Sequence, residues 1–143
     1  NTGAHKFSRL NPGIFSCSFL GLVYALFALG IMLVFGRTLG LLFIDSGQEE
    51  ILGNIYKFLV INSAFYFPLA LVNIVRFMIQ GMGFSQLAVF AGIFELAGRG
   101  LFGLVFVPVF GYTAACFASP AAWILADSFL IPAYFICKKR LER

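Results

Sequence analysis

Three ionisable side chains lie inside long apolar runs of this sequence, where an unpaired charge is energetically costly. Glu95 and Arg99 stand four positions apart in FELAGRG, which puts both on one face of a helix in the favourable order. Asp127 lies midway along a later run and has no charged residue three or four positions away. Each such charge costs about 2.5–3.5 kcal/mol at the centre of a membrane, so these side chains must face other helices or a cavity.

Two interpretations are open for each of these positions. Glu95 and Arg99 form either a structural ion pair that anchors helices or a pair that takes part in gating or substrate contact. Asp127 is a candidate for ion coupling, because a carboxylate inside a membrane without a local partner can bind a proton or another cation. It is structural instead if it bonds to a neighbouring helix or reaches the cytoplasmic interface.

Polar residues and prolines mark the second and fourth apolar regions. We predict that polar side chains of the second region line a substrate pathway or gate; these are Asn62, Tyr66, Asn73 and Gln80. A proline inside a helix removes one backbone hydrogen bond and bends the helix. We therefore predict hinges at three prolines, which are Pro68, Pro120 and Pro132. Such bends accompany substrate sites in transporters and also occur in purely structural membrane helices.

The sequence offers no arrangement of residues for enzymatic chemistry. It contains no Ser/His/Asp set, no phosphate-binding glycine loop and no cluster of Cys and His. Its three cysteines show no metal-binding or disulfide spacing, and its single histidine, His5, lies near the start. The ten lysines and arginines form no stripe, which argues against nucleic-acid binding. We expect no enzyme activity, no metal and no cofactor.

Long apolar runs must position these residues. The 143 residues are 61% hydrophobic and 11% charged, whereas soluble domains carry about a quarter charged residues. The first run, Gly13 to Gly36, is free of charge over about 24 residues, or about 36 Å of helix. Asn11-Pro12 and the capping box Ser46-Gly47-Gln48-Glu49 are typical helix starts. We predict an all-α integral membrane protein with four transmembrane helices at about 12–43, 47–80, 84–108 and 112–138.

Small residues recur along two of the predicted helices. In lipid, helices associate where small side chains let their backbones approach closely. The first helix carries Cys17, Gly21 and Ala25 at intervals of four, and the fourth carries Ala114, Ala118, Ala122 and Ala126. We predict that both faces pack against other helices.

Positive charge predicts the orientation of the helices. Lysines and arginines gather in residues 1–11 and 138–143, while the connection between the first two helices carries Asp45, Glu49 and Glu50. By the positive-inside rule, both ends of the chain are cytoplasmic and the protein lies in the inner (plasma) membrane. We expect residues 1–11 to be a cytoplasmic loop and 139–143 a cytoplasmic tail. The polar opening without Met predicts that the chain is a fragment of a longer protein.

Several stretches of the chain carry a resemblance to a known family. Asn1-Thr2-Gly3-Ala4 followed by Arg9 is similar to the N-x-G-A-x-x-x-x-R stretch of the multidrug and toxic compound extrusion (MATE) family of transporters. RFMIQGMGFS, residues 76–85, resembles the segment that joins its tenth and eleventh helices. FGYTAACFASPAAWILAD, followed by FLIPAYF and a basic tail, resembles its last helix. The order and spacing of the four spans also fit, so the resemblance covers residues 1–143 as helices nine to twelve.

The resemblance implies a twelve-helix exporter with two six-helix lobes, of which this chain is the C-terminal part of the second lobe. It implies an antiporter that expels drug-like or cationic small molecules against entry of H⁺ or Na⁺ by alternating access. The partners implied are the lipid bilayer and helices one to eight of the same polypeptide. Some branches of the family have an acidic residue in the tenth helix, but residues 58–75 contain none. The coupling site is then either outside this chain or at Asp127.

Other membrane functions compete with the exporter. A lipid-linked saccharide flippase of the same superfamily shares the architecture, and Arg99 is the one residue here that suggests its cationic cavity. A non-transporting assembly subunit explains four helices without a coupling site. A four-helix small multidrug transporter needs a carboxylate in its first span, which Gly13 to Gly36 lacks.

Overall fold

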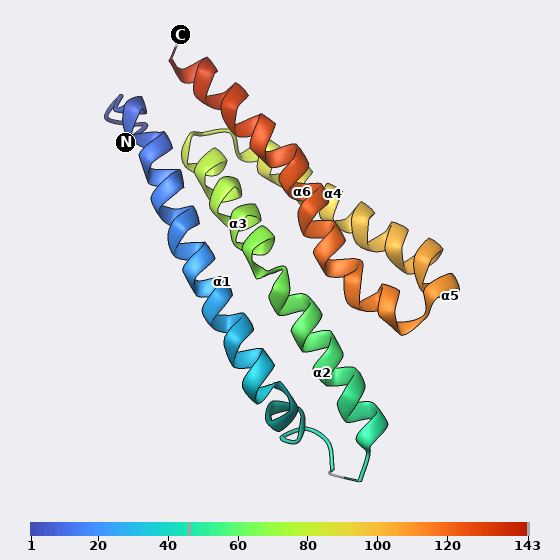
Figure 1. Cartoon of the computed structure of the whole chain (residues 1–143). Coiled ribbons are helices and arrows are strands. Elements are labelled where there is room, and N and C mark those ends of the chain that lie inside the picture. Colours follow the sequence, from blue (N-terminus) through green and yellow to red (C-terminus); the bar gives the residue numbers. More distant parts are fainter. Residues whose placement is uncertain (46, 143) are drawn as a thin grey trace.

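The structure is a computed structural model that describes residues 1–45 and 47–142, and these residues form helices joined by short turns. A 3-10 turn at Phe7–Arg9 precedes α1 (Leu10–Gly40), which is followed by α2 (Glu49–Ala64) and α3 (Tyr66–Gly81). Helix α4 (Ser85–Leu101) continues through a π-helical turn (Phe102–Phe106) into the short α5 (Val107–Phe110), and α6 (Tyr112–Leu141) completes the chain (Figure 1).

The helices confirm the all-α prediction and indicate a membrane location. Three helical stretches are long and apolar enough to cross a membrane: 7–40, 85–110 and 112–141. The α2–α3 pair makes a fourth if it counts as one bent span. The last helix continues to Leu141, beyond the predicted end at 138, and so includes three basic residues in its final turn.

Two helix starts differ from the predictions. Helix α1 begins at Leu10, because the preceding 3-10 turn leads directly into it, and its N-cap is Arg9. The Asn11 side chain does not cap the helix; it accepts a hydrogen bond of 2.8 Å from the Tyr134 hydroxyl. Helix α2 begins at Glu49 with Gln48 as N-cap, and no side chain caps it. Ser46, the first residue of the predicted capping box, lies outside the described residues.

The second span is broken where its proline predicts a bend. Helices α2 and α3 meet at Phe65 with a bend of 48°. Pro68 follows three residues later and cannot donate to the carbonyl of Ala64, which its ring would also crowd. In contrast, α6 continues as one helix through Pro120 and Pro132.

The third span ends differently from the prediction. Pro108 does not terminate the helix, which continues to Phe110. Because Pro108 lacks an N–H, the helix cannot form the usual bond to Leu104, and the turn before it widens into the π-helical segment. Gly111, with a φ of 61°, then reverses the chain into α6, in a conformation that glycine adopts at little cost.

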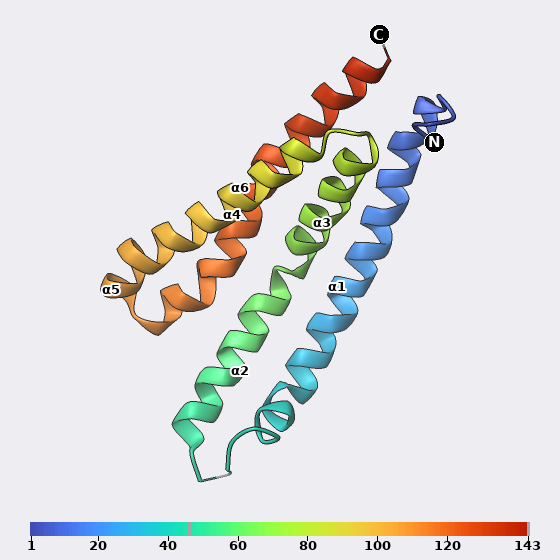
Figure 2. The ribbon, with the colours of Figure 1, turned by 180° about the vertical axis from the view of Figure 1, so that it is seen from behind.

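The helices form two neighbouring hairpins. Helix α1 lies along α2 and α3, while α4–α5 and α6 form a second hairpin on the other side of α3 (Figures 1 and 2). Both termini lie at the same end of the bundle, as an even number of spans predicts. Because each hairpin covers only part of the other, many apolar side chains of α1 and α4 are exposed, as lipid-facing residues are.

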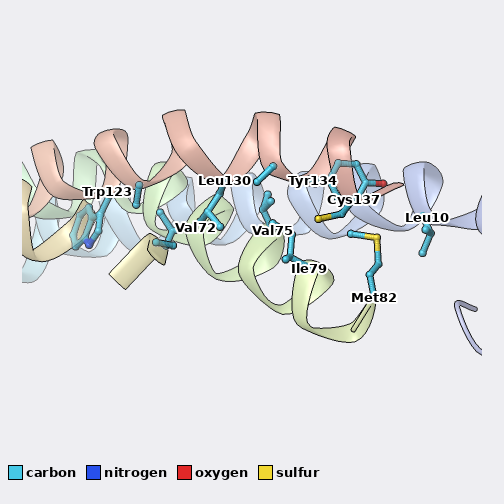
Figure 3. Packing of buried hydrophobic residues seen from close by; sticks show 12 residues of the cluster. Leu10, Val72, Val75, Ile79, Met82, Trp123, Leu130, Tyr134 and Cys137 are labelled. Atoms are coloured by element: carbon cyan, nitrogen blue, oxygen red, sulfur yellow. The ribbon is translucent and has the colours of Figure 1, made fainter. Parts of the chain in front are cut away.

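The core lies between α3 and α6. On α3 the buried side chains are Val72, Val75 and Ile79, and on α6 they include Trp123, Leu130 and Tyr134 (Figure 3). The two predicted small-residue faces pack in part. Gly21 of α1 lies so close to Ala70 that a Cβ there would be 3.1 Å from the Ala70 methyl. Cys17 on the same predicted face is exposed instead.

Candidate functional site

A cluster of charged side chains lies where α3, α4 and α6 meet, and we call it the charged junction (Arg76, Glu95, Arg99 and Asp127). Its centre is Glu95, whose side chain is 17% exposed. The Nη2 of Arg76 donates to Oε1 of Glu95, and this bond joins α3 to α4. On the other side, Nη2 of Arg99 lies 3.6 Å from Oε2 of Glu95. Both carboxylate oxygens of Glu95 therefore face a guanidinium group.

Asp127 lies at the same level of the bundle on the neighbouring helix. Helices α4 and α6 run antiparallel: Gly98 contacts Ala122, and the Phe94 ring stacks on Phe129 at 4.7 Å. Glu95 lies between those two contacts and is therefore level with Asp127. Asp127 is only 7% exposed, and its Oδ1 has no hydrogen-bond partner among the described residues.

Arg76 is the member of the charged junction that sequence reasoning missed as a partner of Glu95. The predicted Glu95–Arg99 pair is present, but Arg76 is the better buried cation, with 23% of its side chain exposed against 50% for Arg99. A signal was available, since Arg76 adjoins the apolar run that precedes Glu95. Its Nε is buried without a partner among the described residues, so its hydrogen bonds are only partly satisfied.

The other predicted polar residues do not join the charged junction. Asn62 and Asn73 donate to the carbonyls four residues earlier, those of Phe58 at 3.0 Å and Leu69 at 2.9 Å. Asn62 also donates to the carbonyl of Cys116 on α6 at 3.4 Å. These bonds stabilise the second span near its break and its contact with α6, so in this structure both amides hold helices.

Two further predicted residues lie apart from those amides. The Tyr66 ring lies 6.5 Å from that of Trp123, on the inner side of α3. Gln80 is exposed at the far end of the same helix. The residues predicted to form a pathway thus spread along the length of the second span, and among them Asn62 and Tyr66 lie against α6.

A cleft of about 620 Å³ lies at the end of α6 that is away from the chain termini. We call it the aromatic cleft, and sequence reasoning did not predict it. No charged residue lines it; the lining residues are Phe65, Phe102, Phe106, Phe110, Thr113, Ala114, Phe117, Pro120, Ala121 and Ile124. Its volume falls within the range of ligand pockets, about 300–1,000 Å³.

Three phenylalanines form one wall of the aromatic cleft. The ring of Phe106 stacks on that of Phe102 at 4.7 Å and on that of Phe110 at 6.4 Å. In an α-helix four residues exceed one turn, so three residues at this spacing drift around the axis. In the π-helical turn four residues fall short of a full turn, and this offset cancels the α-helical one. The π-turn therefore keeps all three rings on one side of the helix.

The opposite wall comes from the helix break and from α6. Phe65 stands at the joint between α2 and α3, and its ring meets Phe117 of α6 edge to face at 6.0 Å. At the end of the cleft, the Nζ of Lys57 donates to Thr113 at 2.6 Å, and the Tyr112 hydroxyl donates to the carbonyl of Asn54 at 3.0 Å. The aromatic cleft thus lies between two helical irregularities, each of which follows from a proline.

Comparison of the chain with models of protein families, with curated proteins and with solved structures gives no match.

Proposed function

We propose that this chain is part of a membrane exporter of the MATE type, which moves drug-like or cationic small molecules by alternating access in exchange for H⁺ or Na⁺. The observation that carries the proposal is the aromatic cleft, an opening lined by aromatic and aliphatic side chains within a bundle of membrane-length helices. Phenylalanine rings bind flat lipophilic compounds by stacking and attract organic cations through their faces. This lining suits the varied substrates of a multidrug exporter.

The helix irregularities around the cleft support a moving structure. Non-helical joints at membrane depth are tolerated where they border a cavity, and they accompany substrate sites in transporters. Here the 48° break at Phe65 and the π-turn at Phe102–Phe106 both border the cleft. We propose that the break near Pro68 is a hinge. Both ends of the chain are cytoplasmic in this proposal, and the membrane is the inner (plasma) membrane.

The charge of the cleft favours the exporter over the saccharide flippase. A flippase for lipid-linked saccharides needs cationic groups for the phosphate of its substrate. The cleft residues carry no charge, and Arg99 lies at the charged junction beside Glu95. The cleft also gives a substrate-sized surface that a purely structural assembly subunit does not need.

The proposal can be tested by dye accumulation in cells that lack their own exporters and carry the complete gene. We expect cells with the gene to accumulate less of a lipophilic aromatic cation than cells without it. This difference should be lost when the gradient of the coupling ion, Na⁺ or H⁺, is collapsed. Phe106→Ala should weaken export, while Phe19→Ala, on the exposed face of α1, should not. Equal accumulation with and without the gene would contradict the proposal. A reading frame without eight further spans before Asn1 would favour the assembly subunit.

A further inference from the structure

Two polar atoms inside the bundle lack partners, and they are complementary. The Oδ1 of Asp127 is a buried acceptor and the Nε–H of Arg76 is a buried donor, and neither has a hydrogen-bond partner among the described residues. A buried polar atom without a partner is costly, and an unmatched pair of this kind calls for an explanation. The two residues lie on α3 and α6, which pack directly against each other.

The contacts between α3 and α6 show how far apart Arg76 and Asp127 lie along the bundle. Tyr66 packs on Trp123, and on the same face Val72 and Val75 lie beside Leu130 (Figure 3). Helices α3 and α6 therefore run in the same direction. Arg76 follows Val75 and is about one turn above Asp127, a distance that a long arginine side chain spans. Its head is already bonded to Glu95, which is level with Asp127.

The two carboxyl groups of the charged junction differ in the partners that surround them. Glu95 has a guanidinium group at each oxygen, as an ionised carboxylate requires. Asp127 is more deeply buried, and no cation among the residues that the structure describes forms an ion pair with it. A buried carboxylate with no cation and no donor is neutral or must acquire a partner. The arrangement in this structure is the one that suits a protonated Asp127 beside an ionised Glu95.

The ligand that fits this place is a proton and not a metal ion. A hard metal cation is held by several oxygen ligands, and the described residues contain no group of three or more acidic, His or Cys side chains that could hold a metal. A proton needs only one oxygen and leaves Arg76 on Glu95.

We propose that Asp127 takes up and releases a proton, and that Arg76 exchanges Glu95 for Asp127 as its partner when the proton leaves. On release, the O–H bond of the Asp127 carboxyl breaks, the proton passes to water, and the electron pair stays on the carboxylate. Arg76 keeps its charge, gives up its bond to Oε1 of Glu95 and donates to Oδ1 of Asp127. Glu95 keeps Arg99 as its cation.

This exchange changes which helices are tied together. With Asp127 protonated, Arg76 ties α3 to α4; with Asp127 ionised, it ties α3 to α6. The biological role of the exchange rests on the proposed transport function, because the exchange would link proton release to a movement of α3 between α4 and α6. Proton binding itself can be measured without any transport.

Few other ionisable groups face Asp127 from the helices around it. The titratable and charged groups on the packed helices are Tyr66 and Arg76 on α3, Glu95 and Arg99 on α4, and Glu49, Glu50, Tyr56 and Lys57 on α2. Lys57 is the last of the α2 groups along the chain. Lys57 is bonded to Thr113, about four turns away along α6, and the segment from Phe102 to Phe110 contains no ionisable residue. The nearest groups are therefore Arg76 and Glu95, the two that the exchange involves.

The sequence allows a direct test, because it contains two aspartates, Asp45 and Asp127. We would label the full chain with aspartate carrying ¹³C in its side-chain carboxyl, place it in lipid nanodiscs, and follow the carboxyl bands by infrared spectroscopy as the pH is changed. Asp45 is exposed and serves as the internal reference. We expect two separate transitions, with Asp45→Asn removing one and leaving the other.

The outcomes decide between the alternatives. Two labelled carboxyls that titrate together, or an Asp127 that never changes its protonation, would overturn the proton site. Sodium chloride that converts the Asp127 band at constant pH would overturn the assignment to a proton. Asp127→Asn should remove the Asp127 transition. If that variant does not fold, Asp127→Glu keeps a carboxyl at the position: the transition should then be lost from a sample labelled at aspartate and appear in a sample labelled at glutamate.

A second comparison tests the exchange. Arg76→Gln should move the midpoint of the Asp127 transition by about one pH unit or more, because the ionised carboxylate loses its new partner. Arg99→Gln, the matched control on the exposed side of Glu95, should move it less. Equal midpoints in the wild type and Arg76→Gln would overturn the exchange. Since these spectra need no transport, failure of the export assay would leave their result unaffected.

Discussion

Helices α4 and α6 meet in two regions, and side-chain size makes the regions different. At the charged junction, Gly98 lies against the backbone of Ala122, and Ala126 is fully buried. Toward the other end, Phe102 and Phe106 lie in the π-turn that follows α4, and they line, with Phe117 of α6, a cleft of about 620 Å³. One helix pair can thus be closed at one end and open at the other, because small residues admit backbone contact and large rings prevent it.

The two regions also meet opposite electrostatic demands. The closed region holds charges, which need close partners in a medium of low dielectric constant. The open region holds only uncharged side chains, which can be uncovered to lipid or to a lipophilic compound without loss. If this division is right, substitutions of Glu95 and Gly98 in the closed region should mainly affect stability, and substitutions at the cleft should mainly affect binding.

The largest effect should come from Glu95→Ala. It leaves the buried guanidinium of Arg76 without its carboxylate, and removing one partner of a buried pair costs roughly 3 kcal/mol. We expect a strong loss of folded yield and a lower Tm in detergent. Glu95→Gln, which keeps an acceptor oxygen, should lose less. A normal yield of Glu95→Ala combined with lost drug resistance would break the comparison and make this residue functional.

The next largest effect should come from Gly98→Ala, which tests the close contact itself. A Cβ at Gly98 would lie 2.9 Å from the Cα of Ala122, so one backbone must move. Overpacking of this kind costs about 1–3 kcal/mol. Gly100→Ala is the matched control, because a Cβ there meets nothing within 4 Å, and it should be neutral or stabilising by up to about 1 kcal/mol. Equal Tm changes for the two variants would contradict the close packing.

Much of the closed region could be predicted from the sequence, since its signals are local. The i, i+4 spacing of Glu95 and Arg99 fixes them on one helical face, and the alanines of the last span mark its packed side. The bend of the second span follows from Pro68, which removes a bond within its own helix. In each case the chemistry of a few neighbouring residues decides the structure.

The remaining features depend on how distant helices cross, which local sequence does not determine. Arg76 reaches Glu95 across the contact between α3 and α4, and the placement of these two helices depends on how both pack on α6. Pro108 predicted a helix end, yet the segment stays helical because a wider turn absorbs the missing bond. The aromatic cleft could not be predicted, because its walls come from three separate parts of the chain.

Phe106→Ala should separate binding from stability. Phe106 is the middle ring of the stacked wall, so its removal takes away aromatic contacts worth about 0.5–1.5 kcal/mol. We expect the affinity for a lipophilic aromatic cation, measured by fluorescence titration of the purified chain, to fall about threefold to tenfold. Its Tm should change little, since the ring borders an opening. A large fall in Tm with unchanged affinity would show that this wall is core and not a binding surface.

The smallest effect should come from Arg37→Ala, which removes an Arg–Glu ion pair that lies outside the charged junction. Arg37 pairs with Glu49 at the connection between α1 and α2, with 63% and 68% of the two side chains exposed. The pair has the same functional groups as Arg76 and Glu95, but water solvates each partner when the other is removed. Exposed pairs contribute about 0–1 kcal/mol and are screened by salt. We therefore expect Arg37→Ala to lower the Tm by at most a few degrees, and this decrease should shrink as salt is added. The decrease in Tm of Glu95→Ala should persist in salt. If Arg37→Ala lowered the Tm as much as Glu95→Ala, burial would not distinguish the two ion pairs.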